Sequence, residues 1–250
     1  MSAASSPIQN WRKDRSLAHI APLVFFQLLL LLVNFGKNSP DAPWYVRAPE
    51  QWVYPLQTVL CGALLVWWWK QYQFDVPSLG HLGLGLIVGA VGIALWILPC
   101  ELYHRLGYDK DSAGWLSYLG VQARMQGFDP SEAPVPVLAI VMRFLRMVVV
   151  VALLEEVFWR GFLMRWLVPT HHGMWTVPFG THHWRALVGS VCGVVLVHQP
   201  ADYAAAFFWA LLLYSLAVRT RSLTACVVAH GVANLILGIH VMATGRYGFW

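Results

Sequence analysis

The stretch VVVVALLEEVFWRGFLMRWLV, residues 148–168, decides how this chain folds. It is as long as the roughly 20 mostly apolar residues that a membrane-spanning helix needs. It nevertheless carries two adjacent carboxylates, Glu155 and Glu156, and then Arg160. A charged group near the bilayer centre costs roughly 2.5–3.5 kcal/mol on insertion scales. The stretch therefore predicts a membrane helix whose charges have a partner, a water-filled cavity or a function.

The composition of the whole chain agrees with a membrane protein. Of its 250 residues, 58% are hydrophobic and 12% are charged, whereas soluble domains carry about 25% charged residues. The mean hydropathy is +0.55, and the 14 Trp suit membrane interfaces. The net charge of +5 is spread over segment ends, which argues against a nucleic-acid partner. We expect an all-α, polytopic integral membrane bundle that forms a single domain over residues 1–250, with the lipid bilayer around it.

Apolar segments predict about seven transmembrane helices, and an eighth stays open. The fourth segment exceeds one simple span, so we expect it to begin as an interfacial helix with Arg143 and Arg146 at the membrane surface. Between the third and fourth segments, AGWLSYLGV (residues 113–121) suggests a short re-entrant or interfacial helix. The seven segments are 18–35, 52–69, 81–100, 137–167, 184–200, 204–218 and 223–243.

Basic residues set the expected orientation through the positive-inside rule. With seven spans they fall on one side, which predicts a cytoplasmic N-terminus and a C-terminus on the far side. We interpret the first apolar run as a retained span and not as a signal peptide, because NFGKN is a poor cleavage site. The basic residues are Arg12, Lys13, Arg15, Lys70, Arg160, Arg165, Arg219 and Arg221.

Small residues predict close helix packing. Gly85 and Gly89 share one helix face, as do Gly189 and Gly193, and that spacing lets helices approach closely in lipid. We expect packing within the chain, with a dimer seam as the alternative. The cysteines have no CxxC spacing, so we interpret them as small packing residues. They are Cys61, Cys100, Cys192 and Cys226.

The two glutamates cannot face the same way on a helix, because neighbouring residues differ by about 100°. Glu156 and Arg160 are four residues apart and can pair on one face. Glu155 then points elsewhere, and a carboxylate in an apolar cavity accepts a proton more readily, as a general base must. The alternative is a structural pair between Glu155 and an arginine such as Arg143, Arg146 or Arg165.

Three polar residues lie in the later apolar segments. His230 and Asn234 share one helix face and suit the binding of a polarised carbonyl oxygen, or else join two helices by hydrogen bonds. His198 closes the fifth segment just before Pro200. It suits the polarisation of a water or the binding of a metal, or else is an interfacial histidine at a helix end. If the helix stops at Pro200, we expect His198 to lie too far out. The doublets His171-His172 and His182-His183 predict a solvated loop, with a metal site as the alternative.

These motifs together resemble the CPBP family, the CAAX protease and bacteriocin-processing (Abi) family of intramembrane proteases. LLEEVFWRGFL matches the EExxxR signature, and a motif ending in His and then HxxxN follow in order within 137–243, the predicted catalytic core. The second family motif is usually FxxxH, and we interpret Val194 as an apolar replacement for its Phe. The tail, with a C-terminal FW, resembles a subgroup of bacterial CAAX prenyl protease-related proteins found with exosortase sorting systems.

The resemblance implies a hydrolase acting on a membrane-associated protein or peptide. It implies that Glu155 and His198 activate water, that His230 and Asn234 hold the oxyanion, and that Glu156 and Arg160 orient the site. We favour no tightly bound cofactor, although Glu and His ligands could hold zinc. The subgroup implies the bacterial inner membrane and a functional link to an exosortase system.

Other classes of function stay open at this level. One is a catalytically idle membrane scaffold or an immunity-type binding protein, which would keep its function when Glu155 is replaced. A bis-histidine haem protein would use His198 and His230. A proton-coupled transporter would use Glu155 as a relay group.

Overall fold

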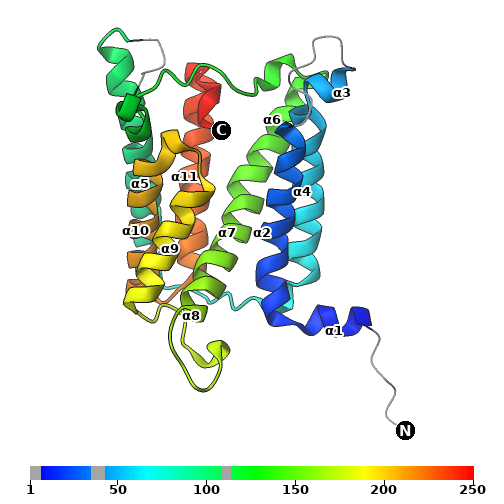
Figure 1. The fold of residues 1–250 in the computed structure, drawn as a ribbon, viewed down its shortest axis with the longest axis vertical. Helices are drawn as coiled ribbons and strands as arrows, with labels where there is room; N and C mark the ends of the chain where they lie inside the picture. Colours follow the sequence, from blue (N-terminus) through cyan, green and yellow to red (C-terminus); the bar gives the residue numbers. More distant parts are fainter. Residues whose placement is uncertain (1–6, 35–42, 109–113) are drawn as a thin grey trace.

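The computed structural model describes residues 7–34, 43–108 and 114–250, and these form a bundle of helices without strands (Figure 1). Each of the seven predicted spans corresponds to one helix. The helices are α2 (Arg15–Leu31), α4 (Glu50–Trp67), α5 (Leu79–Arg105), a continuous helix Pro136–Trp166, α9 (Trp184–Val197), α10 (Tyr203–Thr220) and α11 (Leu223–Thr244). The continuous helix comprises α6 (Pro136–Phe144), the π-helical η5 (Leu145–Val151), α7 (Ala152–Glu156), the π-helical η6 (Val157–Leu163) and α8 (Met164–Trp166).

Four of these helices are long and apolar enough to cross a membrane: Leu79–Arg105, Pro136–Trp166, Pro200–Thr220 and Leu223–Thr244. Arg15–Leu31 and Trp184–Val197 are apolar but shorter, and α4 runs beside α2 (Figure 1). The fold class, a polytopic membrane bundle of helices, is therefore confirmed. The remaining elements are α1 (Pro7–Lys13), η1 (Leu32–Asn34), α3 (Trp44–Arg47), η2 (Trp69–Gln71), η3 (Gly114–Leu119), η4 (Pro130–Glu132), η7 (Met174–Thr176), η8 (Pro200–Asp202) and η9 (Tyr247–Phe249).

Side-chain caps fix where several helices begin. Asp14 accepts a hydrogen bond from the amide of Leu17 at 3.0 Å and caps α2. Ser222 accepts one from the amide of Ala225 at 2.9 Å and caps α11. Such caps satisfy backbone N–H groups that a helix start leaves unpaired. The residue between α10 and the Ser222 cap, Arg221, is left-handed at φ 50° and reverses the chain within two residues.

Glycines set the closest helix contacts, as their spacing predicts. A Cβ at Gly85 would lie 2.9 Å from the carbonyl oxygen of Ala225, and a Cβ at Gly89 would collide with the carbonyl of Ala229. A Cβ at Gly193 would lie 2.7 Å from the Trp159 ring. The glycines therefore bring α11 against α5 and α9 against the Pro136–Trp166 helix. Packing within the chain is confirmed as their use.

The fourth span differs from its prediction. It is one uninterrupted helix, and Arg143 and Arg146 are only 3% and 8% exposed. Their side chains are not exposed on the surface of the bundle, because the helix packs against α4 and turns them inward. Arg146 donates from Nε to the side-chain oxygen of Gln57 at 2.9 Å, and both guanidinium groups stack near the Tyr54 ring.

The predicted basic segments gather at the end of the bundle where α1 lies, opposite to the C-terminus (Figure 1). The Trp68 indole after α4 donates to the carbonyl of Trp11 at 3.1 Å. Arg15 and Arg165 both approach the Trp175 ring, at 4.0 and 5.8 Å from its centroid. The connections after the second and fourth spans thus meet the start of the first. This sidedness is the one that the seven-span prediction requires.

Three smaller predictions also have outcomes. Residues 114–119 form the exposed 3₁₀ helix η3 at the surface of the bundle, not a re-entrant segment, while Ala113 lies outside the described residues. Cys61, Cys100 and Cys226 are buried packing residues, but Cys192 is exposed. All four thiols are free.

The histidine doublets have structural surroundings. His171 and His172 are exposed in the loop before η7, as a solvated loop requires. A ring nitrogen of His182 lies 2.9 Å from the Tyr214 hydroxyl, and His183 accepts from the amide of Arg185 and so caps α9. No metal cluster forms from these residues among those described.

Candidate active site

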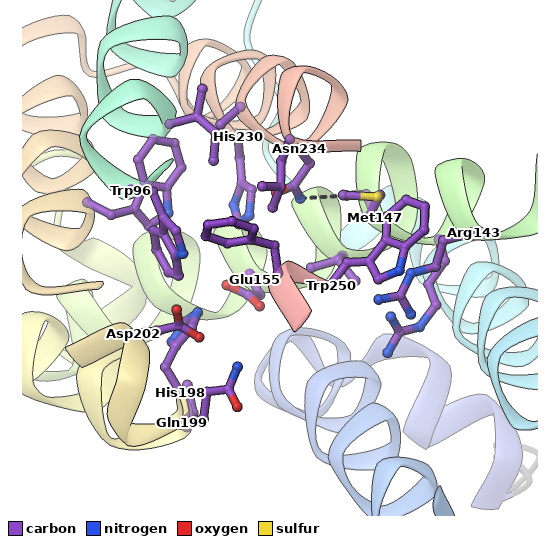
Figure 2. A pocket seen from close by; sticks show the side chains of 18 of the residues that line it. Trp96, Arg143, Met147, Glu155, His198, Gln199, Asp202, His230, Asn234 and Trp250 are labelled. Atoms are coloured by element: carbon purple, nitrogen blue, oxygen red, sulfur yellow. Dashed lines mark hydrogen bonds between the residues drawn. The ribbon is translucent and has the colours of Figure 1, made fainter. Parts of the chain in front are cut away.

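A cavity of about 580 Å³ lies between the Pro136–Trp166 helix, α5, α11 and the turn after α9. Glu155, His198, His230 and Asn234 all line it, although they come from three separate helices (Figure 2). Glu156 and Arg160 lie behind this wall and are fully or almost fully buried. The structure therefore brings together four of the six predicted site residues, places Glu156 against His230 and places Arg160 against Glu156.

His198 reaches the cavity because α9 is short. The helix stops at Val197 after 14 residues, about 21 Å at 1.5 Å per residue, so its end lies within the bundle and not at its rim (Figure 1). The expectation that a helix stopping before Pro200 would leave His198 too far out is therefore wrong. The ring nitrogen Nδ1 lies 2.7 Å from the carbonyl oxygen of Val194, which leaves Nε2 without a protein partner among the described residues.

Val194 itself packs as predicted for an apolar replacement of the family Phe. Its side chain is 1% exposed and belongs to the core shared by α2, α4, α7 and α9. Trp96 lies on another side of His198, with ring centroids 5.4 Å apart. The imidazole is thus held by a backbone carbonyl and an aromatic ring, and its orientation is fixed.

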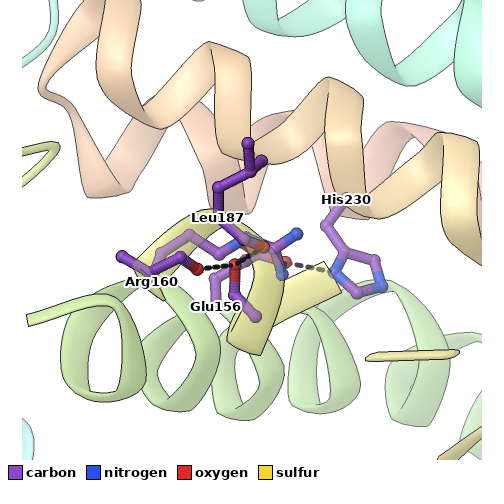
Figure 3. A network of polar contacts seen from close by, with 6 residues as sticks. Glu156, Arg160, Leu187 and His230 are labelled. Atoms are coloured by element: carbon purple, nitrogen blue, oxygen red, sulfur yellow. Dashed lines mark hydrogen bonds and ion pairs between the residues drawn. The ribbon is translucent and has the colours of Figure 1, made fainter. Parts of the chain in front are cut away.

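Glu156 connects Arg160 with His230 (Figure 3). The carboxylate is completely buried. It forms an ion pair with Nε of Arg160 at 3.2 Å and accepts from Nη1 of the same residue at 3.3 Å. Its other contact, 2.8 Å to Nδ1 of His230, joins residues 74 positions apart in the chain. The pair with Arg160 was predicted from the spacing of four residues, whereas the bond to His230 was not.

This bond fixes the tautomer of His230. An ionised carboxylate can only accept hydrogen bonds, so Nδ1 is the donor to Glu156 and carries a proton, and Nε2 is left for the cavity. The Trp209 ring lies edge-on at 5.4 Å and restricts the ring further. A buried arginine, a buried carboxylate and an imidazole in this order form a rigid support behind one wall of the cavity.

Glu155 has a different environment from its neighbour. It is half-buried and lines the cavity. Among the described residues it makes no hydrogen bond and no ion pair. The three arginines considered as partners are engaged elsewhere: Arg146 with Gln57, Arg165 with the carbonyls of Gly161 and Val177, and Arg143 near aromatic rings. Arg146 still attracts the carboxylate electrostatically. The structural pairing alternative is therefore not what the structure contains.

Asn234 uses one of its two amide protons on the protein. Nδ2 donates to the carbonyl oxygen of Met147 at 2.7 Å, in the π-helical part of the long helix. This bond orients the amide beside His230, one helical turn earlier on α11. One amide proton is left for a ligand in the cavity.

Two features of the cavity were not predicted as parts of the site. The first is the pair Arg143 and Arg146, which line its end near Trp250. The second is Asp202, which accepts a 2.6 Å hydrogen bond from Arg124. Arg124 also donates to the carbonyl of Ala201 at 3.0 Å. The pair of Arg124 and Asp202 holds the turn just after His198. The only sign of this role in the sequence is that Asp202 lies close to Pro200.

A metal centre is not assembled in the described part of the chain. Glu155, His198 and His230 line one cavity, but no group of three or more His, Cys, Asp or Glu side chains lies close enough to hold one ion. A catalytic zinc site needs three protein ligands gathered around the metal. The side chains in this arrangement do not fit that requirement.

Fold and site together define a polytopic membrane protein with an unpaired carboxylate, two oriented imidazoles and an amide around one cavity inside its helices. Residues 137–236 match the family model described as type II CAAX prenyl endopeptidase Rce1-like. The match contains all six predicted site residues. It supports the CAAX protease family and, in general, an intramembrane endopeptidase activity. No curated protein and no solved structure matches the chain.

Proposed function

We propose that this chain is an intramembrane endopeptidase that hydrolyses a peptide bond of a membrane-associated protein, with Glu155 as the general base. The observation that carries the proposal is the contrast between the two adjacent glutamates. Glu156 is buried in a network with Arg160 and His230, whereas Glu155 faces the cavity without a hydrogen-bond partner among the described residues. A carboxylate without a hydrogen bond or ion pair to the described residues that faces other polar side chains is suited to chemistry.

Water activation falls to Glu155 and His198. With Nδ1 of His198 donating to a carbonyl, the lone pair of Nε2 can accept a hydrogen bond from a water molecule. Glu155 takes a proton from that water, and the hydroxide oxygen bonds to the carbonyl carbon of the substrate. The proton then passes from Glu155 to the nitrogen of the leaving amine as the peptide bond breaks.

His230 and Asn234 stabilise the oxyanion. His230 donates from Nε2 in the form in which both ring nitrogens carry protons, and its Nδ1 is then held by Glu156 at 2.8 Å. The second amide proton of Asn234 provides another donor. Arg160 holds the Glu156 carboxylate in place, so Glu156 and Arg160 are positioning residues. Donors fixed before the reaction are worth most in a cavity that excludes bulk water.

The proposal includes no tightly bound cofactor, because the described side chains do not gather around one ion. We also propose a bacterial inner-membrane location and a functional link to an exosortase system, on the resemblance of the tail to that subgroup. The basic residues at the α1 end favour a cytoplasmic N-terminus. Cysteine labelling tests this orientation: on a cysteine-free background, His172→Cys should react with a membrane-impermeant maleimide from the cytoplasmic side and Ser131→Cys from the other.

The test of activity is hydrolysis of a membrane-peptide library by the purified protein in lipid. Glu155→Gln and His198→Gln should abolish cleavage in folded protein, and Glu132→Gln is the matched control because Glu132 is exposed outside the cavity. Cleavage should survive a strong chelator. Retained cleavage in Glu155→Gln would refute the assigned base. Loss on chelation that zinc restores would refute the metal-free mechanism and leave the peptidase intact.

A further inference from the structure

Two buried arginines at one end of the site cavity have no role in the chemistry above. Arg143 and Arg146 are 3% and 8% exposed and both line the cavity that holds Glu155. In the view of Figure 2, Arg143 and Trp250 lie at one end, His198 and Asp202 at the other, and Glu155 between them. The two arginines thus form a polar end of the cavity, at a distance from the residues proposed to react.

Neither arginine has an ion-pair partner among the described residues. Arg146 is bound by a neutral amide oxygen, that of Gln57. Nε and Nη1 of Arg143 are buried and have no hydrogen-bond partner among the described residues, and its remaining polar partner is the neutral hydroxyl of Tyr54. Glu50 attracts Arg143 and Glu155 attracts Arg146 electrostatically, but neither arginine forms a salt bridge with another described residue. The two cations therefore face the cavity without a bound counter-charge.

This arrangement is unfavourable unless an anion completes it. Burying a guanidinium without a counter-charge is costly, and two cations three residues apart on one helix face also repel each other. Aromatic faces repay part of the cost: the guanidinium carbon of Arg143 lies 5.1 Å from the Trp250 ring centroid, and that of Arg146 lies 4.7 Å from the Phe26 ring centroid. Nε and Nη1 of Arg143 are left without a hydrogen bond among the described residues, and the in-plane N–H groups of a guanidinium match a planar carboxylate.

We propose that Arg143 and Arg146 form an anion subsite of this cavity that binds a carboxylate of the peptide substrate. The inference rests on the proposed peptidase function. Arg146 and Arg143 precede Glu155 by nine and twelve residues on one helix, at most about 13 and 18 Å along its axis. An extended peptide of about four or five residues covers that distance at roughly 3.3 Å per residue. The carboxylate is therefore about four or five residues from the bond that Glu155 attacks.

The test measures binding without turnover. On a Glu155→Gln background, three apolar peptides of about five residues are titrated by calorimetry: one with a free terminal carboxylate, its neutral amide, and the amide with a glutamate as last residue. Both carboxylate sources are thereby compared with one neutral reference. A short-chain phosphatidic acid provides the lipid phosphate as a competing anion. The subsite should make at least one carboxylate peptide bind about ten- to a hundredfold tighter than the amide, the range for hydrogen bonds between charged groups.

That preference should fall below about threefold in Arg143→Gln and Arg146→Gln, since each removes a charged donor. Arg143→Lys and Arg146→Lys keep the charge and show whether a loss comes from misfolding; they should keep part of the preference. Arg185→Gln is the matched control, because Arg185 also stacks on a ring, that of Trp184, but outside the cavity. It should leave the preference unchanged.

Several results would overturn the subsite. They are equal binding of acid and amide, absence of binding by either carboxylate peptide at millimolar concentration, a preference that survives loss of both arginines, and displacement of both peptides by phosphatidic acid at lower concentration. Failure of the subsite is distinguishable from failure of the peptidase. A carboxylate preference in a protein that cleaves no peptide would refute the proposed function alone, while cleavage without the preference would refute the subsite alone.

Discussion

Replacing Glu155 or Glu156 by glutamine exchanges one carboxylate oxygen for an amide nitrogen. We expect Glu156→Gln to have the larger effect on stability and Glu155→Gln to have the larger effect on activity. Glu156 is fully buried, with Arg160 at 3.2 Å and His230 at 2.8 Å. Glu156→Gln keeps the shape but leaves the Arg160 guanidinium, which is 2% exposed, without its counter-charge. Removing one partner of a buried ion pair typically costs about 3–5 kcal/mol of unfolding free energy.

Glu155→Gln should cost far less. It breaks no hydrogen bond or ion pair of the described residues, and it removes a charge from the wall of the cavity. A substitution away from specific contacts changes stability by about 0.5 kcal/mol in either direction. The difference between the two variants should therefore be about 3 kcal/mol or more. The loss of activity should be larger for Glu155→Gln, because this variant lacks the general base, whereas Glu156→Gln lacks only a positioning residue.

Reversible unfolding in mixed micelles with increasing denaturing detergent, followed by circular dichroism, measures the difference. A paired substitution adds a control: Glu156→Leu with Arg160→Met removes both charges together and should recover much of the loss, because replacing a buried ion pair by apolar side chains is often neutral. Equal destabilisation by Glu155→Gln and Glu156→Gln would refute the division of labour. So would a double variant no more stable than Glu156→Leu alone.

Further predictions concern the packing around the site. Gly89→Leu should destabilise the fold by about 1–3 kcal/mol or more in a thermal unfolding assay, because its Cβ meets α11. Gly83→Leu should be neutral in that assay, because no atom lies within 4 Å of a Cβ at this position. Equal effects of the two substitutions would contradict the close packing. Asp202→Asn should cost about 3–5 kcal/mol by leaving Arg124 unpaired, and an unchanged melting temperature would exclude that clamp. Gln57→Leu should cost about 1–3 kcal/mol, because it leaves the carbonyl of Phe26 and Nε of Arg146 unbonded, and a stabilised variant would contradict it.

The sequence was sufficient for the helices and for contacts within one helix. Apolar runs placed all seven spans close to their observed limits. A membrane helix must pair its own backbone groups within lipid, so the length of its apolar run indicates the length of the helix. The pair of Glu156 with Arg160 followed from helical spacing alone. Helix depth alone permitted a common site for Glu155, His198, His230 and Asn234 without requiring it, and the family resemblance implied one; in the structure these four side chains line one cavity.

Contacts between helices that are distant in the sequence could not be predicted from apolar runs and helical spacing. Arg146 is bound to Gln57, 89 positions earlier, and Glu156 to His230, 74 positions later. No local pattern specifies either partner. Arg143 and Arg146 were placed at the membrane surface because a charge at the start of a long apolar segment usually lies there. Their burial depends on α4, whose aromatic and amide side chains approach them only in the folded bundle.

The position of His198 shows why the site needs a broken helix. A histidine at the end of a helix that crosses about 30 Å of bilayer would lie at its surface, and α9 avoids this by stopping after 14 residues. Irregular backbone at that depth is tolerated only where protein or a cavity satisfies its polar groups. Here the imidazole of His198 engages the carbonyl of Val194, and Arg124 engages the carbonyl of Ala201 and the carboxylate of Asp202. The same contacts that make the break tolerable orient the imidazole towards Glu155's cavity, so the stability of the turn and the geometry of the site depend on one set of residues.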